Sequence, residues 1–186
     1  MTPKVVFASA AMAMSLAIAA PASGAAFVLG GGLADACSRF AVQGRSDDYS
    51  LSTCTYALET ESLVKRDRAA TLVNRGVIQL RRKAFAAANR DFDTAIRLQP
   101  GLGEAFVNRG AALIAQRRWQ EGLTDIDKGL ALGADEPEKA YFNRALANEG
   151  LDDMAAAWRD YNKALEIAPE WDAPRKELAR FTVTPK

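Results

Sequence analysis

The sequence predicts an all-helical protein built from repeated helical hairpins. Three segments share one short pattern, an asparagine followed by an arginine and a small residue, beginning at Asn74, Asn108 and Asn143. These segments are 34 and then 35 residues apart, and a fixed period of this length is typical of repeat proteins. Within each period, apolar residues recur at helical spacing in two runs separated by a short turn. Each repeat is therefore expected to be a pair of antiparallel helices.

The N-terminal segment, residues 1–26, has the pattern of a signal peptide for export. Lys4 precedes an apolar run over residues 5–20, and small residues follow it. Cleavage is expected after Ala22 or after Ala26, and the sequence does not decide between them. The run is shorter than the roughly 20 apolar residues of a membrane-spanning helix, although an uncleaved anchor remains an alternative. We expect an exported protein, periplasmic in a bacterial envelope, whose mature form has no membrane span.

Residues 27–68 are predicted to hold a flexible leader and a degenerate first hairpin, with helices over 33–42 and 48–59. The chain has 2 cysteines, Cys37 and Cys54, and export brings them into an oxidising compartment. The midpoint between them falls in a polar segment, so the two residues face each other across the hairpin. We predict a structural disulfide that contributes about 3 kcal/mol. A redox-active pair is the alternative, but the spacing is far from Cys-x-x-Cys.

The regular repeats are expected to occupy residues 69–171. Small residues flank a large one in each second helix, and the first example is Ala88, Phe92 and Ala95. Small side chains let the paired helices approach closely, while large ones fill the space between hairpins. The predicted repeats are 69–102, 103–137 and 138–171, with helices over 69–81, 85–98, 102–115, 119–132, 138–149 and 153–167.

The last segment, residues 172–186, is expected to be a capping helix and a tail. Its helix should begin near Asp172, with Pro174 in the first turn, where proline is favoured. A cap is needed because the last hairpin of a solenoid otherwise leaves its apolar side in water.

The 34-residue unit, with its small-large-small second helix and a closing proline at Pro100 and Pro169, resembles the tetratricopeptide repeat (TPR). The resemblance covers residues 69–171. It implies a solenoid of helical hairpins whose first helices line a concave groove. The second unit departs from the pattern, because glycine and alanine stand at 133–134 where proline is expected.

One repeated pair of charges links the two helices of each hairpin. The arginine and the aspartate of each pair are 16 residues apart and straddle the turn. Both lie at about the same distance from the turn, so they are predicted to meet as a structural ion pair, partly buried, that sets the helix register. The pairs are Arg75 with Asp91, Arg109 with Asp125, and Arg144 with Asp160.

The repeated asparagines are candidates for peptide binding. A side-chain amide both donates and accepts hydrogen bonds, so three amides along one groove could hold the backbone of an extended peptide. Equally, each asparagine could tie neighbouring hairpins together, and the sequence leaves this open. Some of the apolar residues near them are expected to be core. The candidate binding residues are Asn74, Asn108, Asn143, Val77, Val107, Lys139 and Phe142.

Lys139 is one of these candidates because of a resemblance to carboxylate-binding co-chaperones of the TPR family. Those proteins have an asparagine and a lysine where Asn108 and Lys139 stand. The remainder of their clamp is missing here, because Val73 and Val77 replace two of its polar residues and Asn143 replaces its arginine. We therefore do not predict carboxylate specificity.

Composition narrows the possible functions. The chain has 24 Lys plus Arg against 23 Asp plus Glu, and the resulting net charge of +1 argues against nucleic acid as a partner. It has 0 histidines, which argues against most metal and proton-transfer chemistry. We predict a non-enzymatic adaptor for a protein or peptide partner, with no cofactor and no metal. A self-assembling or chaperone-like component of an envelope complex, as a homo-oligomer, is the alternative.

Overall fold

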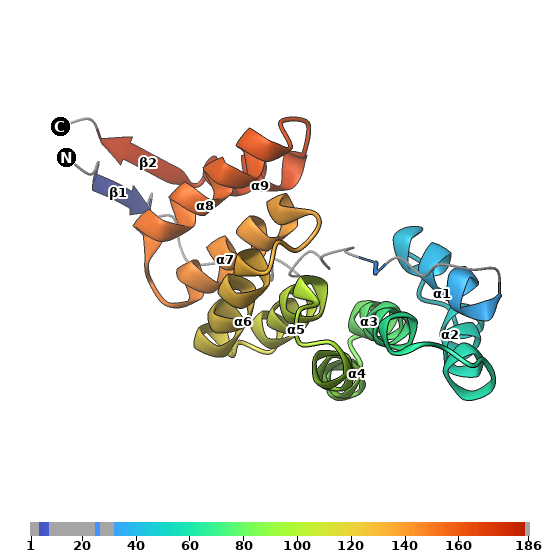
Figure 1. Cartoon of the computed structure of the whole chain (residues 1–186). Helices are drawn as coiled ribbons and strands as arrows, with labels where there is room; N and C mark the ends of the chain where they lie inside the picture. Colours follow the sequence, from blue (N-terminus) through green and yellow to red (C-terminus); the bar gives the residue numbers. More distant parts are fainter. Residues whose placement is uncertain (1–3, 8–24, 27–31, 185–186) are drawn as a thin grey trace.

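A computed structural model describes residues 4–7, 25–26 and 32–184 of the chain. Its helices pack as successive hairpins along one stack (Figure 1). Two short strands, β1 (Lys4–Phe7) and β2 (Phe181–Thr184), lie beside the last hairpin. The helices are α1 (Leu33–Val42), α2 (Asp48–Thr60), α3 (Lys65–Arg81), α4 (Phe85–Leu98), α5 (Gly103–Ala115), α6 (Trp119–Ala131), α7 (Pro137–Gly150), α8 (Met154–Ile167) and α9 (Asp172–Leu178).

The predicted all-helical class and the hairpin solenoid are confirmed. The largest difference from the expected bounds is at α3, which begins at Lys65 rather than at residue 69. Its additional first turn is polar and mostly exposed, so apolar periodicity, which starts at Ala69, could not reveal it. Helix α7 begins at Pro137, where the fixed φ of proline suits a first helical residue.

The strands join the two ends of the described chain. They pair antiparallel, with Lys4 opposite Thr184 and Phe7 opposite Phe181. Strand β1 falls inside the predicted signal peptide, of which residues 1–3 and 8–24 lie outside the described part. In the part of the chain that is described, no helix is both long enough and apolar enough to cross a bilayer.

The first hairpin is closed by the predicted disulfide. Cys37 in α1 and Cys54 in α2 are bonded, with Cα atoms 4.9 Å apart, and both are fully buried. The turn between the helices ends at Asp47, whose carboxylate accepts the backbone N–H of Ser50 and so caps α2. Hydrogen bonds from Arg45 and from Ser50 lower the pKa of Asp47 to about 2.

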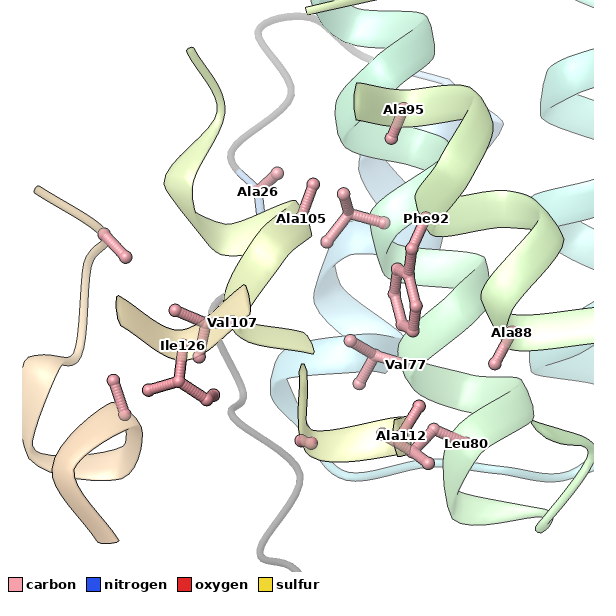
Figure 2. Packing of buried hydrophobic residues seen from close by; sticks show 14 of the residues in the cluster. Ala26, Val77, Leu80, Ala88, Phe92, Ala95, Ala105, Val107, Ala112 and Ile126 are labelled. Carbon is pink, nitrogen blue, oxygen red and sulfur yellow. The ribbon is translucent and has the colours of Figure 1, made fainter. Parts of the chain in front are cut away.

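The regular hairpins are packed by a small residue of the first helix against a large residue of the second. A Cβ atom on Gly76 would lie 2.5 Å from the ring of Phe92, and one on Gly110 would lie 2.9 Å from Ile126. Phe92 and Ile126 are fully buried, and Figure 2 shows both among the core side chains. The glycines therefore allow the two helices to approach closely. In the first hairpin, the Cys37–Cys54 bond joins α1 and α2.

Candidate peptide-binding face

The first helices of the hairpins form one face of the stack. Helices α1, α3, α5 and α7 contact one another in sequence order, and α2, α4, α6 and α8 lie behind them (Figure 1). We call the surface made by α1, α3, α5 and α7 the first-helix face. Each repeated asparagine lies on one of its helices.

Asn74, on α3, binds the backbone of a segment far away in the sequence. Its Nδ2 donates to the carbonyl oxygen of Ala26 at 3.0 Å, across 48 residues of chain. The hydroxyl of Ser38, on α1, lies 3.4 Å from the same carbonyl and donates to it. Ala26 lies outside any helix or strand, so two polar side chains of the first-helix face hold the main chain of a non-helical segment.

The other two asparagines are equally buried but differ in their surroundings. Asn108, on α5, donates through Nδ2 to the backbone carbonyl of Glu104 in its own helix, at 2.9 Å. The Oδ1 atoms of Asn74 and Asn108 are buried, and neither accepts a hydrogen bond from the residues that the structure describes. Asn143 is fully buried on α7. Among these amides, the structure therefore places Asn74 against a distant main-chain segment and Asn108 against its own helix.

The apolar candidates lie in the core. Val77, Val107 and Phe142 are 0%, 2% and 3% exposed. The ring of Phe142 packs between Tyr161 at 5.5 Å and Trp171 at 5.0 Å, which are distances typical of favourable aromatic pairs. A helix inside a stack is covered on several sides, so helical spacing from an asparagine does not place a residue on the outer surface.

Lys139 is engaged in a local ion pair. Its ammonium group contacts the carboxylate of Glu136, the residue that precedes α7. Glu136 has a left-handed backbone, with φ of 53°, where the chain enters α7. In this structure Lys139 therefore supports the start of the helix.

The three predicted ion pairs are formed, each with two hydrogen bonds. Arg109 donates through Nε and Nη2 to the two carboxylate oxygens of Asp125, at 2.6 and 2.8 Å. Arg75 binds Asp91 in the same way at 2.8 Å, and Arg144 binds Asp160 at 2.9 and 2.7 Å. The aspartates are buried while the arginines are partly exposed. Two parallel bonds fix the orientation of the guanidinium group.

The third nitrogen of each arginine extends this link to the preceding hairpin. Arg109 Nη1 donates to Asp93 on α4 at 2.7 Å, and Arg144 Nη1 donates to Asp127 on α6 at 2.8 Å. Arg75 Nη1 reaches Thr55 on α2 at 3.3 Å. We call these three arginines with their partners the arginine relay. The hydrogen bonds that the three arginines donate to their aspartates raise the pKa of all three guanidinium groups, so the relay stays charged.

Sequence reasoning missed the partners in the preceding hairpins, although a signal for them exists. Asp93 follows Asp91 by two residues, and Asp127 follows Asp125 by two. In the third repeat the same place holds Asn162, which instead donates to a carbonyl of its own helix. Thus the position two residues after the paired aspartate holds a second aspartate only where the following repeat supplies an arginine to bind it.

A polar cluster holds the C-terminal end of the stack. The hydroxyl of Tyr161 donates to Glu149 at 2.6 Å, and Arg180 Nη2 lies 2.6 Å from carboxylate oxygens of both Glu149 and Glu177. Burial raises the pKa of the Glu177 carboxyl and of the Tyr161 hydroxyl. The cluster ties the end of α9 to the last hairpin, in agreement with its predicted capping role.

A hollow of about 460 Å³ lies among α4, α5 and α6. Arg109, Asp93 and Asp125 of the arginine relay line part of it, together with the exposed pair of Arg118 and Glu121. Positively and negatively charged side chains both line this hollow, so its electrostatic potential does not favour a ligand of either charge. Within the described residues, no group of three or more acidic, histidine or cysteine side chains is arranged to hold a metal ion.

Comparisons with known proteins agree with this architecture. No protein-family model matches the chain. The Hsp70-Hsp90 organizing protein of Triticum aestivum is 34% identical over 95 residues, which are 51% of this chain but only 16% of that protein. The Arabidopsis OM64 TPR domain superposes with a TM-score of 0.59 at 22% identity, over 63% of this chain and 96% of that domain. MamA from Desulfovibrio magneticus RS-1 gives a TM-score of 0.62 at 20% identity, over 80% and 82%. The chain therefore has the TPR fold.

Replacing Arg109 with alanine tests the arginine relay. The change leaves the buried Asp125 carboxylate without its cation, so we expect a loss of about 3 to 5 kcal/mol in the free energy of unfolding. Asp93 is 44% exposed on its side chain, and Asp93→Ala should therefore cost about 1 kcal/mol or less. Urea unfolding followed by circular dichroism measures both.

Arg118→Ala is the matched control, because it removes an exposed arginine that is ion-paired with Glu121. The variant should unfold at nearly the wild-type urea concentration, because exposed ion pairs contribute little to stability. Arg109→Ala combined with Asp125→Ala should cost clearly less than the sum of the two single changes. Additive costs would show that the two side chains do not interact as the structure has them.

Proposed function

We propose that this chain is a non-enzymatic adaptor of the cell envelope that binds a protein or peptide partner through the first-helix face. The observation that carries the proposal is the contact between Asn74 and Ala26. There, a side-chain amide of the face bonds to a backbone carbonyl, which every peptide possesses. Recognition of main-chain groups gives affinity without demanding one sequence, as is known for other extended peptides.

The comparisons support the adaptor class. By its name, the relative from Triticum aestivum organises two other proteins, and the part of it that matches lies in a stretch of 95 residues. Open hairpin stacks present long surfaces to partners. In the described part of the chain, the buried amide oxygens of Asn74 and Asn108 accept no hydrogen bond. A peptide N–H could satisfy such an acceptor once the residues that cover it move aside, whereas an apolar ligand could not.

Self-assembly is the second candidate, favoured by exposed apolar side chains on the first hairpin. Val42 is 62% exposed, and Tyr49 and Tyr56 on α2 are 66% and 57% exposed. Surfaces of this kind at the end of a stack can join copies of one chain. Sedimentation of the purified protein separates the two candidates, because an oligomer that dissociates on dilution supports assembly and a monomer supports the adaptor.

The proposal includes export of the protein, and export leads to a separate prediction about the mature N-terminus and the cysteines. The mature protein should begin between Ser23 and Phe27 and should contain no free thiol, because Cys37 and Cys54 are bonded. Intact-mass measurement of periplasmic material, with and without an alkylating reagent, reads out both features. A retained N-terminus or two alkylated cysteines without prior reduction would contradict this part of the proposal.

Asn108→Ala tests binding through the first-helix face. The change removes an unpartnered acceptor and a hydrogen bond within one helix, so we expect the free energy of unfolding to move by about 1 kcal/mol or less. Partner recovery from the envelope fraction, quantified by mass spectrometry against the wild type, should fall at least fivefold.

Asn162→Ala is the matched control. Its amide makes the same type of bond within α8, to the carbonyl of Trp158, but it is exposed and lies behind the first-helix face. It should recover the partner as the wild type does. A large loss of stability in Asn108→Ala, with unchanged recovery per folded molecule, would assign that asparagine a purely structural role.

A further inference from the structure

We propose that the first-helix face between α1 and α3 is a subsite for an extended peptide segment with two consecutive alanine-sized residues, and that Ala25–Ala26 fills it in the full chain. A partner segment of the same chemistry would then bind by displacing the chain's own residues. The inference rests on the proposed adaptor function and adds to it a ligand class and a competitor.

The main chain of the occupant is held at one carbonyl. The oxygen of Ala26 receives two donors, Asn74 Nδ2 at 3.0 Å and the hydroxyl of Ser38 at 3.4 Å. The donors come from neighbouring helices of the face, so the carbonyl lies between them. Both donors are buried, since Asn74 is 0% and Ser38 is 7% exposed. A bond of this kind selects for a peptide backbone rather than for a particular side chain.

The side chains of the occupant set its size. Ala26 is 6% exposed and belongs to the main hydrophobic core, near Ala105 in the view of Figure 2. Ala25 packs against the second cluster, which contains the disulfide and Ile78. Because Ala26 is buried among packed core residues, a longer side chain there would overlap with them, and the partly buried Ala25 also has less room than an exposed residue. The subsite therefore selects two small apolar residues in succession.

The chain's own segment uses only part of what the subsite offers. Asn74 donates through Nδ2, but among the described residues nothing donates to its buried Oδ1. A ligand whose backbone presented both a carbonyl and an N–H to this amide would satisfy both atoms. Such a ligand has an advantage over Ala25–Ala26, which makes the internal occupant a displaceable competitor.

The predicted cleavage sites give this competition a consequence. Processing after Ala22 would keep Ala25–Ala26 in the mature chain and leave the subsite filled. Processing after Ala26 would remove both residues and leave the subsite open. The choice between the two sites therefore sets the apparent affinity for a partner.

The test uses the full chain and a synthetic peptide with blocked ends, Ser-Gly-Ala-Ala-Phe-Val-Leu-Gly, which copies residues 23–30. Ala26→Glu should expel the internal segment, because a carboxylate is strongly disfavoured in the core. Ala86→Glu, which adds the same charge at an exposed position of α4, is the control. Fluorescence polarisation should show at least tenfold tighter binding to Ala26→Glu than to the wild type or to the control.

Two further comparisons define the specificity. Changing the Ala-Ala pair of the peptide to Leu-Leu should weaken binding to Ala26→Glu at least tenfold, and adding Asn74→Ala should reverse the gain in affinity. Equal binding to the wild type and Ala26→Glu, or equal binding of the two peptides, would overturn the proposal. If the subsite proposal fails in this way, a fall in partner recovery with Asn108→Ala would still support the adaptor function. Failure of the subsite proposal can therefore be distinguished from failure of the adaptor function.

A second measurement applies if Ala26→Glu does not fold. In otherwise wild-type protein, Asn74→Ala should speed thermolysin cleavage beside Ala26 at least threefold relative to Asn162→Ala. Nuclear magnetic resonance should also show hydrogen exchange of the Asn74 side-chain amide at least tenfold slower than that of Asn162. Unchanged cleavage together with fast amide exchange would show that Ala26 is not held by Asn74.

Discussion

The arrangement of the hairpins depends on one repeated interaction, an arginine that binds two neighbours at once. Arg109 forms two bonds with Asp125 of its own hairpin and a third with Asp93 of the hairpin before it. The first contact sets the register of two antiparallel helices, and the second sets one hairpin against the next. Because planar guanidinium geometry restricts both contacts, repetition of the same residue positions α3, α5 and α7 as one continuous surface.

The two ends of the stack use other contacts, because no further repeat packs against them within the residues that the structure describes. At the start, a threonine takes the place of the aspartate in the preceding hairpin, and the Cys37–Cys54 disulfide closes the short first hairpin. At the other end, Asn162 stands where no later arginine follows, and Arg180 joins α9 to Glu149. Terminal units of a solenoid differ from internal ones for this reason, since one side of each has no repeat to pack against.

Much of this structure could be predicted from the sequence, because residues that are equally far from a hairpin turn face each other across the hairpin. The period is visible in the recurring pattern itself, and the disulfide and the pairs within hairpins, such as Arg109 with Asp125, follow from residues equidistant from a turn. Contacts between different hairpins cannot be predicted in this way, because the spacing of residues in the sequence does not determine the angle between repeats. Asp93 was missed for this reason. Ala26 was missed because a segment without periodicity carries no signal for its packing partners. Val77 and Phe142 are buried because neighbouring helices cover them. The residue pattern of one helix does not show which of its faces the neighbouring helices cover.

We expect the arginine relay to make the hairpins one cooperative unit and so to keep the first-helix face in a single shape. Native-state hydrogen exchange of backbone amides in α3, α5 and α7 tests this most directly. If the relay couples the hairpins, the slowest amides of the three helices will share one free energy of opening. They will also respond together to denaturant. Separate opening of α3 with α4, well below the free energy of α5 and α7, would contradict the account.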